Sequence, residues 1–339
     1  MRRTRRRTLI GVGIAGLAAA AAALSLFAPA GEIVVENAPP GELRRFREAT
    51  AVPPPPPRAL RHVLRIGREG PGGGEFAGPF GVSISADGEV YVTDDLGHSV
   101  QVFDRDGTFR RRIGGHGTAP GRFAYPDCTV TDGRGLVVAD TGNNRVQFLD
   151  ASGAAREQLR GWGWLGRFRN PRAVALDGQG RLFVADWGND CVHVFGPDWR
   201  RIRRIGRRGG GAGEFRGPIA LALGPAGALY VSDFGNHRVQ VFDAAGRFLS
   251  AFGEEGAAPG RFDHPVGLAR DGAGRLYVAD QGNRRVQVFT PRGEFLAAFT
   301  GDDAAGVRLD TPCGLAVGAG ERLHVADAGA HCVWVFAIE

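Results

Sequence analysis

The stretch Tyr230-Val-Ser-Asp-Phe-Gly-Asn-His-Arg-Val-Gln-Val-Phe-Asp243 decides the fold, because its skeleton recurs along the chain. Five further copies can be recognised, at 91–103, 137–148, 183–195, 277–289 and 324–336. The copies are anchored by aspartates spaced 46 or 47 residues apart: Asp94, Asp140, Asp186, Asp233, Asp280 and Asp327. A fixed period of this length is typical of a repeat architecture, in which neighbouring units bury one another's apolar faces.

Each unit predicts four short strands joined by tight turns. In the fifth unit they are expected at 265–269, 276–280, 285–289 and 294–299, and glycines that tolerate positive φ lie in the turns between them. The second strand is apolar on both faces, as a sheet packed between two other sheets requires. Six such units predict an all-β, six-bladed β-propeller with four-stranded blades.

The Asp-x-Gly-Asn-x-Arg-Val turn has a structural explanation. The Asp ends one strand and the Arg begins the next, so the two can form a charge-assisted hydrogen bond across the mouth of the hairpin. Sixfold repetition favours this structural role over catalysis. Three units depart from the pattern, with Ser99, Cys191 and Cys332 in place of the Arg.

Together with Pro-x-Gly-Leu-Ala before it and Phe-Gly-x-x-Gly-x-x-Pro-Gly-x-Phe after it, the skeleton resembles the NHL repeat over roughly residues 60–339. The resemblance implies a six-bladed propeller, in agreement with the repeat count. Residues 60–66 match a fourth strand, and the last unit stops after its third strand. We therefore expect the N-terminal strand to complete the last blade and to close the ring, which removes exposed sheet edges.

The segment before the propeller divides into two parts. Residues 2–7 hold five Arg, and residues 9–30 carry no charge, which predicts an apolar helix in 1–30 that is either a cleaved export signal or a membrane anchor. Both alternatives place the propeller outside the cytoplasm. Residues 31–58 are expected to form a Pro-rich, solvated linker, in which 44–47 could make a short helix or touch lipid head groups.

The distribution of charge and the spacing of the cysteines argue against a nucleic-acid-binding protein and against a zinc-ribbon or CxxC site. All 42 basic residues are Arg, which together with the Ala, Gly and Pro content suggests a bacterial source. The net charge of +6 resides mostly in the N-terminal segment, so the propeller lacks the basic balance of a nucleic-acid-binding protein. Cys128, Cys191, Cys313 and Cys332 match no zinc-ribbon or CxxC spacing and are expected to be free thiols.

The candidate ligand site lies where the repeats differ from one another. We expect the residues after each strand-opening proline and the residues of the Asp-turns to share one face around the central channel. The predicted ligand-binding residues at this channel mouth are Asp127, Arg172, Trp187, Asp190, His237, Arg284 and His331. The alternative for each of them is an ordinary surface loop residue. Trp162 and Trp164, in a short outer connection, either cover a blade edge or contact a partner.

No metal, cofactor or catalytic site is predicted. His98, His237 and His331 occupy equivalent turns of different blades, too far apart to share one zinc ion. The chain also resembles the peptidyl-hydroxyglycine amidating lyases, a family in which, as the resemblance implies, a His after the opening Pro helps to hold zinc. None of the six residues at that position is His.

The sequence therefore favours a non-catalytic, monomeric, extracytoplasmic propeller that binds a protein, peptide or glycan. It would contact the membrane through 9–30 if that segment is not cleaved. A propeller lyase or hydrolase is the alternative, and nucleic-acid binding is a weaker one.

Overall fold

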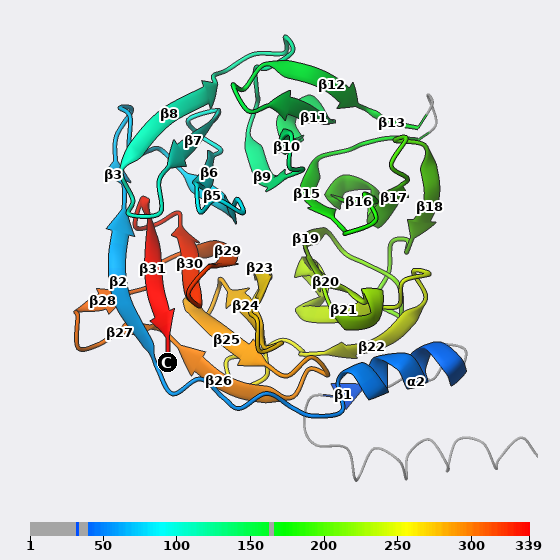
Figure 1. The fold of residues 1–339 in the computed structure, drawn as a ribbon. Coiled ribbons are helices and arrows are strands. Elements are labelled where there is room, and N and C mark those ends of the chain that lie inside the picture. The colour runs from blue at the N-terminus through cyan, green and yellow to red at the C-terminus, as the bar shows by residue number, and fades with distance from the viewer. Residues whose placement is uncertain (1–31, 34–39, 163–165) are drawn as a thin grey trace, which may run out of the picture. The chain divides into compact units, whose positions relative to one another are not determined.

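The computed structural model describes residues 32–33, 40–162 and 166–339, and this part of the chain forms a ring of six antiparallel sheets (Figure 1). The apolar helix predicted in 1–30 lies outside the described residues. Within the described residues, no helix is long and apolar enough to cross a membrane.

The blades follow one another in chain order, each beginning with its innermost strand. Blade one contains β5 (Pro79–Ile84), β6 (Val90–Asp94), β7 (Ser99–Phe103) and β8 (Phe109–Gly114). Blade two contains β9 (Pro126–Thr131), β10 (Gly135–Asp140), β11 (Arg145–Asp150) and β12 (Ala155–Leu159). Blade three contains β15 (Pro171–Leu176), β16 (Leu182–Asp186), β17 (Cys191–Phe195) and β18 (Arg201–Ile205).

Blades four to six repeat this order. Blade four contains β19 (Pro218–Leu223), β20 (Leu229–Asp233), β21 (Arg238–Phe242) and β22 (Phe248–Phe252), with β1 (Glu32–Ile33) added at its outer edge. Blade five contains β23 (Pro265–Arg270), β24 (Leu276–Asp280), β25 (Arg285–Phe289) and β26 (Phe295–Phe299). Blade six contains β29 (Pro312–Gly318), β30 (Arg322–Asp327), β31 (Cys332–Ile338) and β2 (Leu60–Ile66).

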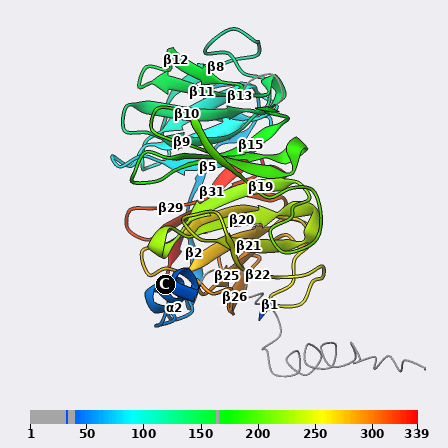
Figure 2. The same ribbon diagram turned by 90° about the vertical axis from the view of Figure 1, so that its right-hand side faces the viewer.

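The strand pattern confirms the predicted six-bladed propeller of four-stranded blades. Every residue of β6, β16, β20 and β24 is buried, because these second strands lie between the sheets of two neighbouring blades. The outer strands β8 and β18 alternate between exposed and covered residues, as strands with one wet face do. The strands run through the thickness of the ring, so the turns between them lie on two opposite faces (Figure 2).

Short paired segments lie between the blades. They are β3 (Arg68–Glu69) with β4 (Glu75–Phe76), β13 (Gly161–Trp162) with β14 (Gly166–Arg167), and β27 (Gly301–Asp302) with β28 (Val307–Arg308). Single 3-10 turns are η1 (Thr141–Asn143), η2 (Trp187–Asn189), η3 (Pro225–Gly227) and η4 (Phe234–Asn236). Three of these turns, η1, η2 and η4, follow the repeated aspartates directly.

Strand β2 pairs with β31 and supplies the outer strand of blade six. Its register pairs Leu60 with Ile338 and Ile66 with Val333, across a sequence separation of more than 260 residues. Backbone hydrogen bonds continue beyond the strands, from Arg58 N–H to the Glu339 carbonyl and from Glu339 N–H to the Ala59 carbonyl. The first and last strands of the ring are thus joined in one sheet.

Part of the segment expected to be a solvated linker is instead docked on the propeller. Helix α2 (Pro40–Ala49) contacts the η3 turn of blade four, and its Phe46 is buried in the apolar cluster between blades four and five. The Arg292 guanidinium donates to the Arg47 carbonyl at 2.7 Å and to Thr50 Oγ1 at 3.0 Å. The alternative of a short helix at 44–47 is present within α2, and the helix docks because Leu43 and Phe46, three residues apart, share one apolar face.

Candidate functional site

The repeated aspartates lie at the centre of a buried hydrogen-bond network in each hairpin. In blade two, Asp140 accepts from Arg145 Nε at 2.6 Å, from Asn143 Nδ2 at 3.0 Å and from Gln147 Nε2 at 3.0 Å. Blades four and five repeat the ion pair, Arg238 with Asp233 at 2.8 Å and Arg285 with Asp280 at 2.7 Å. The predicted Asp–Arg contact is therefore present in these three blades.

The arginine also holds the outer loop that precedes its blade, which the sequence analysis did not anticipate. Arg145 donates to the carbonyls of Thr118, Ala119 and Arg122, and Arg285 does the same at the equivalent loop of blade five. The Phe-Gly-x-x-Gly-x-x-Pro-Gly-x-Phe motif supplies these carbonyls. Blades three and six, where Cys replaces Arg, have connections of a different sequence, at 160–168 and 300–310.

Four of the residues that immediately precede the third strand of a blade fasten one blade to the next. His98, Asn144, Asp190 and His237 have φ between 51° and 53°, the left-handed conformation, in which short polar residues are favoured. Asp190 Oδ1 accepts the backbone N–H of Gly217 at 2.8 Å, and His237 Nδ1 accepts that of His264 at 3.2 Å. His98 and Asn144 accept equivalent N–H groups 26 or 27 residues further along the chain. Asp190 and His237 thus have a structural role that the sequence analysis missed.

The other two predicted turn residues differ. Arg284 is 70% exposed and forms an ion pair with Asp310 of the next blade at 3.3 Å. His331 has a buried Nδ1 that has no hydrogen-bond partner among the described residues. The His residues predicted not to share a metal have separate neighbours: His98 lies against His116 and Tyr125, and His237 lies against His264.

Asp127 and Arg172 meet where two first strands begin. Arg172 Nε lies 3.3 Å from Asp127 Oδ2, and the Asp127 side chain is only 3% exposed. Burial raises the pKa of the Asp127 carboxyl to about 7, with the Arg172 charge acting in the opposite direction and nearby Asp95 adding to the rise. Neither Arg172 Nε nor Asp127 Oδ2 makes a well-aligned hydrogen bond within the described residues. This ion pair is therefore poorly satisfied by the protein itself.

Trp187 extends the site outward from this pair. The Arg172 guanidinium lies 5.7 Å from the centre of the Trp187 ring and 5.5 Å from that of Phe80, within the range of cation–π attraction. Trp187 is 39% exposed, and two further exposed apolar side chains, Leu96 and Tyr125, belong to the same face, in an Asp-turn and just before a first strand. We call Leu96, Tyr125, Arg172 and Trp187 the turn-face patch. Leu96 and Tyr125 were not predicted. Tyr125 stands at a position that varies between repeats, and Leu96 stands at a position that is Gly in the other five.

The rest of the channel mouth is more apolar than expected. Phe80, Ile219, Val266 and Cys313, four of the six residues after the opening prolines, pack together with Phe234. Beneath them lies a cavity of about 220 Å³ between the six innermost strands, lined mainly by Val, Leu, Ile and Ala side chains. Of the predicted mixed polar funnel, only Asp127 and Arg172 supply charge at the strand starts.

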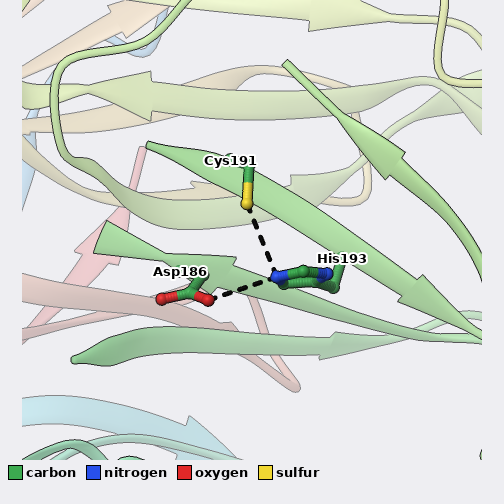
Figure 3. A group of neighbouring side chains, drawn as sticks. All are labelled: Asp186, Cys191 and His193. Carbon is green, nitrogen blue, oxygen red and sulfur yellow. Dashed lines mark hydrogen bonds and ion pairs between the residues drawn. The ribbon is translucent and has the colours of Figure 1, made fainter. Parts of the chain in front are cut away.

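Two clusters of side chains combine metal-ligand types within the described residues. One is partly exposed on the turn face and contains His237, Asp263 and His264. The other is buried in blade three and contains Asp186, Cys191 and His193 (Figure 3). All four cysteines are free, as predicted.

The ring of six four-stranded blades with repeated Asp-turns defines the class of NHL-type β-propellers. The NHL repeat family matches residues 168–195, 215–242 and 262–289. NHL-repeat-containing protein 4 of Mus musculus is 31% identical over 121 residues, which cover 35% of this chain and 82% of that protein. The chain belongs to the NHL repeat family.

Other relatives are much longer than their matched regions. The brain tumor protein of Drosophila melanogaster is 25% identical over 136 residues, covering 39% of this chain and 13% of that protein. The human E3 ubiquitin-protein ligase NHLRC1 is 32% identical over 170 residues, covering 48% of this chain and 41% of the ligase. The chain thus spans less than half the length of either relative.

Solved structures share the fold at low sequence identity. A gluconolactonase from Xanthomonas campestris has a TM-score of 0.62 at 17% identity and covers 85% of this chain and 98% of its own. Virginiamycin B lyase from Staphylococcus aureus has a TM-score of 0.53 at 15% identity, with 83% and 89% covered. At these identities the likeness concerns the fold alone.

Proposed function

We propose that this propeller is a binding module that holds a segment of a protein or peptide on the turn-face patch. The observation that carries the proposal is the exposure of Leu96, Tyr125 and Trp187 on one face of the propeller, where among the described residues the one other exposed Phe, Tyr or Trp side chain is Phe295, on the outer strand β26. Exposed apolar side chains that gather on one face are typical of an interaction site. A relative named for joining ubiquitin to proteins is consistent with a protein ligand.

Trp187 and Arg172 are the expected anchors of the ligand. Trp and Arg dominate interface energetics, and the stacked pair already occupies a fixed position at the edge of the channel mouth. The left-handed Gly217 lies against the Trp187 indole, where a Cβ would collide with the ring. The tryptophan is therefore positioned before a ligand arrives, which lowers the entropic cost of binding.

The experiment selects peptides against the full chain from a displayed random library and measures their Kd for variants. Trp187→Ala and Arg172→Ala should each weaken binding by about 1–3 kcal/mol, roughly ten- to a hundredfold. Ile202→Ala is the matched control, because Ile202 is 50% exposed on the outer strand of the same blade. Asp233→Ala should lower stability instead of affinity, since it removes the acceptor of Arg238.

Unchanged affinity in both patch variants would contradict the proposal and direct attention to the outer blade edges near Trp162 and Trp164. Trp164 lies outside the described residues. Glycans, the other ligand class expected from the sequence, can be tested on the same variants. The location outside the cytoplasm stays a prediction that rests on residues 2–30.

A hydrolase or lyase is the second candidate, and Asp127 is the observation that favours it. A carboxyl group whose pKa lies near 7, next to a cavity, is suited to act as a general base. This function would show as turnover of lactone or ester substrates that is lost in Asp127→Asn. Binding at the turn-face patch without such turnover would favour the binding module.

A further inference from the structure

The hairpin of blade three has a pair of side chains at its centre that no other blade has at these positions. Cys191 stands where the ion-pairing Arg stands in blades two, four and five, and His193 stands where their Gln stands. His193 Nε2 lies 3.2 Å from Asp186 Oδ2 and 3.5 Å from Cys191 Sγ (Figure 3). The side chains come from the adjacent strands β16 and β17, and all three residues are buried.

The charge of Asp186 is compensated by different groups from those around its equivalents. Asp140, Asp233 and Asp280 each face a guanidinium at 2.6–2.8 Å. Asp94 and Asp327 have no such partner, but each accepts three backbone N–H groups: those of Ala77, Gly78 and Gly97 for Asp94, and those of Asp310, Thr311 and Ala330 for Asp327.

Asp186 has a different set of donors within the described residues. It accepts one backbone N–H, from Arg169 at 2.8 Å, and the side-chain amide of Asn189 at 2.7 Å, besides the His193 contact. A buried carboxylate is costly unless a positive partner or several hydrogen bonds compensate it. Asp186 thus lacks both the guanidinium of blades two, four and five and the three backbone N–H groups of blades one and six, and it is the aspartate that faces a thiol and an imidazole.

We propose that Asp186, Cys191 and His193 form a binding site for a divalent metal ion of the zinc class. Carboxylate oxygen, thiolate sulfur and imidazole nitrogen are all ligands of Zn²⁺. Around a tetrahedral Zn²⁺, nitrogen, oxygen and sulfur ligands at their usual bond lengths are about 3.3–3.6 Å apart. The measured separations of 3.2 and 3.5 Å are close to this spacing. The ion would take the place of the missing guanidinium and would join β16 to β17.

Metal binding changes the protonation of Cys191 and fixes that of His193. The Cys191 thiol loses its proton to solvent as the sulfur–metal bond forms, so one proton is released for each ion bound. Because each ion bound releases this proton, binding should weaken as the pH falls. His193 must present its Nε2 lone pair and carry its proton on Nδ1. Before an ion binds, Nε2–H faces the Asp186 carboxylate, which can only accept, so metal binding must move that proton to Nδ1, an atom without a partner among the described residues.

The partly exposed cluster on the turn face is a weaker candidate. His237 Nδ1 already accepts the His264 N–H, and His264 Nδ1 lies 2.6 Å from Asp263 Oδ1. The first contact repeats the blade fastening seen at His98, where no carboxylate is involved. This cluster also lacks a thiol, which gives the experiment a way to distinguish the two.

The test titrates Co²⁺ into the purified, metal-free full chain, because thiolate-bound Co²⁺ has a characteristic charge-transfer absorption. Wild type should bind one equivalent with this absorption and should melt at a higher temperature when loaded. The double variant Cys191→Ser with His193→Gln should lose both effects. Its fold should persist, since Ser99 and Gln101 occupy the same two positions in blade one. Single His193→Gln is a second variant that reproduces the residue of blades two, four and five.

Cys332→Ser is the matched control, because Cys332 is the equivalent thiol of blade six and has Trp334 in place of the His. It should leave Co²⁺ binding and the absorption unchanged. The proposal is overturned if wild type gives no charge-transfer absorption, or if the absorption persists in the double variant. Binding without the thiolate absorption would also overturn it, and would indicate the partly exposed cluster of His237, Asp263 and His264.

Discussion

At the scale of single residues, a position that differs from one repeat to the next can still have a structural role. Asp190 and His237 vary between repeats, and yet both fasten neighbouring blades through a backbone N–H. Asn, Asp and His can all accept this hydrogen bond in the left-handed conformation, so variation there does not imply a ligand. Asp127 and Arg172 have no equivalent in other blades, so they remain the stronger candidates for contact with a ligand.

The Asp127 carboxyl predicts a dependence of stability on pH. Its pKa in the folded protein, about 7, is above the ordinary value of 3.8, so the stabilisation it gives is complete at acid pH and is lost as the pH rises through 7. Between pH 5 and pH 8, the unfolding free energy of wild type should therefore fall relative to that of Asp127→Asn by about 2 kcal/mol. Urea unfolding of both proteins at the two pH values measures this difference. A constant difference would show that Asp127 is ionised throughout.

At the scale of secondary-structure elements, strand positions could be predicted from the sequence because two signals agreed. Apolar runs such as residues 276–279 were bounded by turns of fixed composition, and the whole pattern recurred every 46 or 47 residues. No such pair of signals marks helix α2 in the sequence. Half of its ten residues are charged and a single one is aromatic, so their local pattern resembles that of a charged linker. Its partners, Arg292 and the apolar side chains of blades four and five, are about 200 residues or more away in sequence. Long-range contacts of this kind are invisible to local patterns.

Docking of α2 should depend on Phe46. Phe46→Ala removes the buried ring of the helix, and we expect α2 to detach while the propeller stays folded. Trypsin should then cleave after Arg44, Arg45 and Arg47 at least about tenfold faster, because local opening exposes these bonds. Glu48→Ala, which alters only an exposed ion pair with Arg44, is the control and should leave the cleavage rate unchanged. Equal cleavage in the two variants would mean that Phe46 does not hold the helix.

At the scale of the whole molecule, blade six takes its outer strand from far away in sequence. The repeat count and the unfinished last unit predicted this arrangement, and the pairing of β2 with β31 is the corresponding contact. The candidate site could not be predicted as fully. The composition of the channel mouth depends on which side chains from six separate blades meet, and Phe80, Ile219, Val266 and Cys313 meet one another there.

Removal of β2 should therefore cost more than removal of everything before it. A chain that lacks residues 1–67 loses the buried Leu60 and Ile66, and should be less stable by about 3–6 kcal/mol than one that lacks only 1–57. It also exposes the edge of β31, so it should associate in size-exclusion chromatography. Thermal melting of the two truncations gives the comparison, and equal melting temperatures would contradict a closing role for β2.

The pairing of β2 with β31 also bears on how the protein is made. During synthesis, β2 emerges from the ribosome more than 260 residues before its partner, and at ordinary elongation rates it waits for tens of seconds. Throughout that interval its backbone donors and acceptors have no strand beside them, and the growing array of blades is an open arc. A nascent chain of this design is at its most vulnerable to mispairing just before it is finished, and a chaperone that shields β2 would act in that period.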